Sequence, residues 1–124
     1  MIAGTAAVIA RAAIEAEKAE LRLRIASLDR RLERLRRARN DLSSARDTVR
    51  ELRDEIRRNG TPDRVWRGAR CNEYEIDMGH FFSIYRQYYS HIGNAISSIR
   101  RRITQLEIER VAAQMRLRTL QLIP

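Results

Sequence analysis

The side chains best suited to metal binding or acid–base chemistry gather in the second half of the chain, where Cys71, His80 and His91 stand near Glu73 and Asp77. His80 and His91 are eleven residues apart, so on a helix they share a face but cannot both reach one metal ion. Glu73 and Asp77 suit the start of a helix, where the dipole favours acids. A glycine-rich phosphate loop, a nucleophile elbow and paired acids are missing from the sequence. We therefore expect no metal site, no cofactor and no enzymatic activity.

Arginine side chains form a second group of candidate functional residues, because they can bind phosphate or acidic proteins. The 124 residues carry a net charge of +9, and basic runs at 30–39 and 99–103 raise nucleic-acid binding as a hypothesis. Residues 22–58 also hold seven acids among thirteen arginines, which is typical of a solvated, salt-bridged helix face. Between Met78 and Leu106 there are arginines and no acids, a pattern that suits an acidic protein partner as well as phosphate. A homodimeric, arginine-rich coiled coil that binds nucleic acid or is purely structural is therefore the alternative to the function given below.

Heptad spacing of apolar residues predicts that a long helix carries the first half of these charges, over about residues 5–58. Apolar residues also flank the main heptad line, which is listed below. Ile25 and Leu32 lie on one side of it, and Ala38, Ala45 and Leu52 lie on the other side further along the helix. Such a change of side is expected because a straight helix drifts against a seven-residue repeat. The main line consists of Leu21, Leu28, Leu35, Leu42, Val49 and Ile56.

A corner over residues 59–70 and a second helix over about 71–121 complete the pattern. Gly60 suits the position after a helix end, and Pro62 follows where a helix cannot continue. Arg110 is the one polar break in the two apolar lines of the second helix. The first line is Met78, Tyr85, Ile92, Ile99, Leu106, Ala113 and Leu120, and the second is Phe82, Tyr89, Ile96, Ile103 and Leu117.

Two helices of similar length joined by a short corner predict an all-α fold, an antiparallel two-helix hairpin that forms a single domain over residues 1–124. The second helix has a broad aromatic face near the corner, and an exposed face of that kind is a binding surface. We expect it to pack on a partner chain and complete a four-helix bundle, as a hetero-oligomer, with a homodimer left open. The predicted partner-binding residues are Tyr74, Met78, Phe81, Phe82, Tyr85, Tyr88, Tyr89 and Ile92.

The corner contains RVWRG, in which Trp66 is the only tryptophan and Gly68 follows two places later. A tryptophan that plugs a bundle end, with a permissive glycine beside it, explains the pair in structural terms. Because it falls in the connection of a hairpin with nearly equal halves, the chain resembles the WXG superfamily of ESAT-type helical hairpins. FFSIYRQYYSHI and SSIRRRITQLE in the second helix make it most similar to the YwqH-like branch, whose genes accompany LXG-domain toxins.

The resemblance implies a targeting factor or chaperone of type VII secretion that binds the helical N-terminal LXG domain of a polymorphic toxin. It allows a second small helical protein as a further partner, and implies that Trp66 and Gly68 are read by the secretion ATPase or membrane apparatus. The Y-x-x-x-D/E motif of exported pairs is absent, in both its tyrosine and phenylalanine versions, so the resemblance places that signal on the partner.

The opening MIAGTAAVIA lacks a basic segment and is too short to span a bilayer, which predicts neither a signal peptide nor a membrane anchor. The single cysteine excludes an internal disulfide. We therefore expect the chain in the cytoplasm, with co-secretion beside its partner left open.

Overall fold

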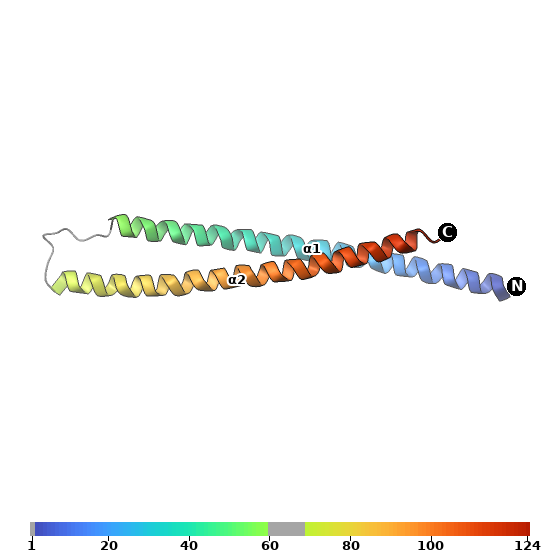
Figure 1. Ribbon diagram of the computed structural model, residues 1–124, viewed down its shortest axis with the longest axis horizontal. Coiled ribbons are helices and arrows are strands. Elements are labelled where there is room, and N and C mark those ends of the chain that lie inside the picture. Colours follow the sequence, from blue (N-terminus) through green and yellow to red (C-terminus); the bar gives the residue numbers. More distant parts are fainter. Residues whose placement is uncertain (1, 60–68) are drawn as a thin grey trace. The chain divides into compact units, whose positions relative to one another are not determined.

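Two long α-helices make up the computed structural model, which describes the backbone of residues 2–59 and 69–124 and the side chains of residues 4–58 and 72–124. α1 spans Ile2–Asn59 and α2 spans Ala69–Gln121 (Figure 1). The helices pack against each other as an antiparallel hairpin, and the described residues form no strand. The predicted all-α hairpin is confirmed, whereas Trp66 and Gly68 of the predicted corner lie outside the described residues.

Contacts divide the hairpin into two compact units, each built from a segment of α1 and a segment of α2. Met1–Arg37 and Arg101–Pro124 form one, here called the terminal unit, and Ala38–Arg100 forms the other, the corner unit.

The terminal unit has an aliphatic core. Leu32 and Leu106 are each only 1% exposed, so their burial supplies much of the driving force for pairing the helices. Ion pairs border the core on the surface: Arg36 lies 3.1 Å from Glu107, and Arg116 lies 2.9 Å from Glu17. Such exposed pairs stabilise the fold by well under about 1 kcal/mol each. The buried residues of this unit are Leu28, Leu32, Ile103, Leu106, Ala113 and Leu120.

Arg110 occupies a seam position of α2 in the terminal unit. Its side chain is half-buried, and Nε pairs with Asp29 Oδ1 on α1. The polar break in the heptad pattern is thus matched by an acid of the same chain, with the aliphatic stem of Arg110 left in the seam.

The corner unit differs because arginine replaces aliphatic residues in its seam. Tyr85, Ile92 and Ile96 are buried on α2, as both predicted α2 lines require. On α1, the line begun by Ile25 and Leu32 continues through half-buried Arg39, Arg46 and Arg53. The predicted change of flank is wrong beyond the half-buried Ala38, since Ala45 and Leu52 are exposed. Long arginine stems can cover apolar surface while the guanidinium group reaches an aromatic ring. The line begun by Ile25 and Leu32 can therefore stay in the interface between the two helices.

Candidate interaction surface

The structure distributes the predicted partner-binding residues between the seam and its edge. Tyr85 and Ile92 are buried inside the hairpin, at 7% and 8% exposure. Phe81 is half-buried beside the seam, and Tyr88 is 64% exposed. The others are half-buried, and they are Tyr74, Met78, Phe82 and Tyr89. The predicted set therefore divides into two residues of the intrachain core, five half-buried residues and the exposed Tyr88.

Three arginines of α1 lie over three aromatic rings of α2 in the corner unit. The distances from guanidinium carbon to ring centroid are 5.8 Å for Arg50 over Tyr89, 5.3 Å for Arg53 over Tyr85, and 5.1 Å for Arg57 over Phe82. Each distance is within the range of a cation–π interaction, typically about 0.5–1 kcal/mol at exposed sites. These pairs, which we call the arginine ladder, explain why arginines at these positions coexist with so many aromatics.

Polar contacts position two members of the arginine ladder further. Arg50 Nη2 donates a 2.7 Å hydrogen bond to Tyr89 Oη, and this bond raises the pKa of Arg50 above its ordinary value. The guanidinium group of Arg53 donates to Asp54 Oδ1 at 3.0 and 3.2 Å. Both arginines therefore have polar partners within their own chain.

The aromatic rings also contact one another along α2. Tyr85 and Tyr89 stack with centroids 5.8 Å apart, and Phe81 meets Phe82 edge-on at 5.3 Å. Tyr85 Oη is buried and has no hydrogen-bond partner among the described residues. A buried, unpaired hydroxyl costs about 1–3 kcal/mol, so the ring of Tyr85, rather than its hydroxyl, is what the packing uses.

An apolar groove of about 550 Å³ runs between the helices on the corner unit. Ala45 lines one wall and Tyr88 and Ala95 the other, with Ile92 at the base. Leu42 and His91 complete the lining. An uncovered surface of this composition is typical of a site where another protein packs.

Two apolar residues extend this side of the unit beyond the predicted set. Leu52 follows Ala45 by seven residues and is 49% exposed, and Ile84 precedes Tyr88 by four and is 62% exposed. Both spacings keep the side chains on the side of the helix that faces the groove. Leu52 was visible in the sequence as a seam residue, but only the packed structure shows that it faces outward.

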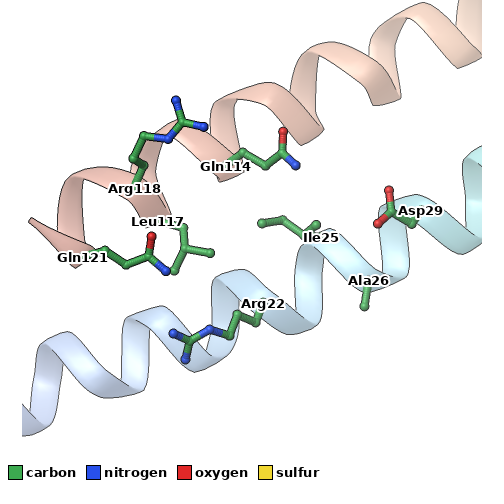
Figure 2. A pocket seen from close by; sticks show the side chains of 8 residues that line it. All are labelled: Arg22, Ile25, Ala26, Asp29, Gln114, Leu117, Arg118 and Gln121. Atoms are coloured by element: carbon green, nitrogen blue, oxygen red, sulfur yellow. The ribbon is translucent and has the colours of Figure 1, made fainter.

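A second groove, of about 400 Å³, lies on the terminal unit and has mixed polarity (Figure 2). Ile25 and Leu117 point towards each other between the helices, while Arg22 and Arg118 extend outward at the rim. Both arginines are exposed, and the groove's acid, Asp29, already pairs with Arg110. Solvated rim charges of this kind hold anions only weakly, so this groove is not a built site.

The histidines and the cysteine, which are the side chains best suited to metal binding, form no site in the described part of the chain. His80 and His91 are exposed on α2, and the side chain of Cys71 lies outside the described residues. No group of three or more His, Cys, Asp or Glu among the described residues is placed to hold a metal ion. Within the same residues, no helix is long and apolar enough to cross a membrane.

Fold and surface together define a helical hairpin whose corner unit has aromatic rings covered by arginine and an uncovered apolar groove. Residues 10–122 match the YwqH-like family model, so the chain belongs to the YwqH-like family. No curated protein and no solved structure matches the chain.

Proposed function

We propose that this chain is a targeting factor or chaperone that binds the helical N-terminal LXG domain of a polymorphic toxin and helps present it to a type VII secretion system. The observation that carries the proposal is the uncovered apolar groove at Ala45, Tyr88 and Ala95. A hairpin covers each of its helices from one side only, and an apolar groove between two helices is a surface on which the apolar face of another helix can pack.

Membership of the YwqH-like family supports the proposal. In this role the chain acts by protein binding, without a cofactor, in the cytoplasm. Trp66 and Gly68 form the feature that the secretion apparatus reads once the toxin domain is bound.

The first test is a pull-down of the tagged chain from its native host, with nuclease added and mass spectrometry of the co-eluting proteins. About 0.3 M salt screens exposed charges, so binding through the apolar groove should persist. We expect one stoichiometric helical partner joined to a toxin domain. Recovery of the chain alone, or only of nucleic acid when nuclease is omitted, contradicts the proposal.

Two groove variants localise the binding. Tyr88→Glu places a charge in the groove and should abolish recovery of the toxin domain, because a buried unpaired charge is strongly unfavourable. Ile76→Glu is the matched control, since Ile76 is 58% exposed on the same helix but faces away from the groove. Trp66→Ala should leave binding intact and abolish export, which separates the docking site from the secretion signal.

A further inference from the structure

Most of the chain's net positive charge belongs to the terminal unit. Its two segments hold fourteen basic and seven acidic residues, against eleven and nine in the corner unit. Two of its acids, Glu33 and Glu107, already pair with Arg37 and Arg36. An excess of positive charge is therefore available to a partner on this unit.

Three arginines from both helices line one groove of the terminal unit. Arg31 and Arg34 come from α1 and Arg102 comes from α2, around a volume of about 380 Å³. Leu35 and Leu106 complete the lining, and no acid among the described residues contributes to it. The groove thus combines a leucine base with positive charge from both helices.

The arginines of this groove are not neutralised by acids of their own chain. Arg31 and Arg34 are exposed, and neither has a hydrogen bond or ion pair with another described residue. Arg102 is also exposed and donates a 3.3 Å hydrogen bond to the neutral side-chain amide of Gln105. The groove therefore differs from the one in Figure 2, whose lining includes Asp29.

We infer that this groove binds an acidic amphipathic helix of another protein, with the apolar stripe of that helix on the leucine base and its carboxylates against the arginines. The inference goes beyond the proposed function, which rests on the groove of the corner unit. Guanidinium groups pair with carboxylates through two parallel hydrogen bonds, and helices dock in grooves by an apolar face. Complementary charge then sets the choice of partner and the encounter rate.

The positive surface around this groove is too short to favour nucleic acid. Glu109 follows Arg102 by seven residues on the same face of α2 and lines a neighbouring groove. Asp41 likewise follows Arg34 by seven on α1. A nucleic-acid backbone carries a charge at every nucleotide and would meet these acids, whereas a helix carries carboxylates only where its sequence places them. The leucine base also suits an apolar stripe better than phosphate.

Three synthetic helices test the inference with the full-length chain. The first has glutamates beside a leucine and alanine heptad stripe, the second has lysines in place of the glutamates, and the third keeps the glutamates but has glutamine in place of leucine. At low salt, the first should bind at least about tenfold more tightly than either of the others, measured by fluorescence anisotropy. Equal binding of the first and second helices would overturn the inference, and so would equal binding of the first and third.

Matched charge reversals locate the site. R34E/R102E reverses one arginine on each helix and should weaken binding of the first helix at least about tenfold. R22E/R118E makes the same change in net charge at the rim of the groove in Figure 2 and should leave that affinity within about twofold. If both variants weaken binding equally, overall charge governs it and the inference fails. Circular dichroism checks that both variants fold, and R34Q/R102Q replaces the reversal if it does not.

The same variants distinguish other occupants of the groove. If R34E/R102E lost affinity for a labelled nucleic-acid duplex but bound the first helix as the native chain does, the groove would bind phosphate and the inference would be wrong. A native dimer that R34E/R102E converts to monomers, measured by sedimentation velocity, would make a second copy the occupant and also overturn the inference. Loss of the first helix by R34E/R102E, with sedimentation unchanged, supports it.

Discussion

At the scale of single residues, arginine has two uses in this hairpin. On the surface of the terminal unit it forms ion pairs, as between Arg36 and Glu107. In the corner unit it is a seam residue whose stem packs and whose guanidinium group lies over a ring, as with Arg53 and Tyr85. Counting arginine as simply polar therefore misjudges half of the hairpin.

Removing the hydroxyl of Tyr85 should stabilise the fold. Tyr85→Phe keeps the ring beneath Arg53 and eliminates a buried oxygen that has no hydrogen-bond partner, so the free energy of unfolding should rise by about 1 kcal/mol. Urea denaturation followed by circular dichroism measures it. Tyr89→Phe is the control, because it deletes the hydrogen bond from Arg50 and should lower stability slightly. A loss of stability in Tyr85→Phe would show that its hydroxyl has a partner after all.

At the scale of helices, the heptad repeats predicted the hairpin and both apolar lines of α2. They failed on α1, where Arg39, Arg46 and Arg53 continue a line whose pattern of apolar residues stops at Leu32. Periodicity along α1 could not reveal this, because the ring that lies under Arg53, Tyr85, belongs to the other helix. The separation of Tyr88 from Tyr85 likewise depends on how the two helices face each other, which one helix alone does not specify.

Glycine inside α2 provides a test at this scale. A Cβ built at Gly93 meets no atom within 4 Å, so Gly93→Ala should raise the free energy of unfolding by about 1 kcal/mol through helix propensity alone. Thermal unfolding measures the change. Ser97→Gly is the opposite test, because it introduces a glycine one turn further along α2 on an exposed face. It should lower stability. A destabilised Gly93→Ala variant would mean that this side of α2 is covered in solution.

At the scale of the whole molecule, the net charge of +9 does not show where the charges lie. The corner unit keeps its arginines in the seam and on one side and its apolar groove on the other. Three of those arginines already lie over rings of the same chain. That arrangement favours a protein-binding role over the recognition of phosphate.

Nucleic-acid binding by the purified chain should accordingly be weak and lost steeply with salt. Contacts from exposed arginines alone are sequence-independent, and affinity for a labelled duplex should fall by orders of magnitude between about 50 and 200 mM salt. Fluorescence anisotropy measures this. Retention of tight binding at the higher salt, or a preference for one sequence, would support the alternative of a nucleic-acid-binding coiled coil.

The two kinds of seam also differ in how long they stay closed. Aliphatic side chains such as Leu32 and Leu106 exclude water from the core of the terminal unit, whereas the arginine ladder places charged groups along the seam of the corner unit. Amide hydrogens of α2 around Tyr89 should therefore exchange with deuterium sooner than those around Leu106. The segment that carries the apolar groove is then the one that opens most often, and if the proposed partner helix binds there, it should slow exchange of this segment more than that of the aliphatic segment.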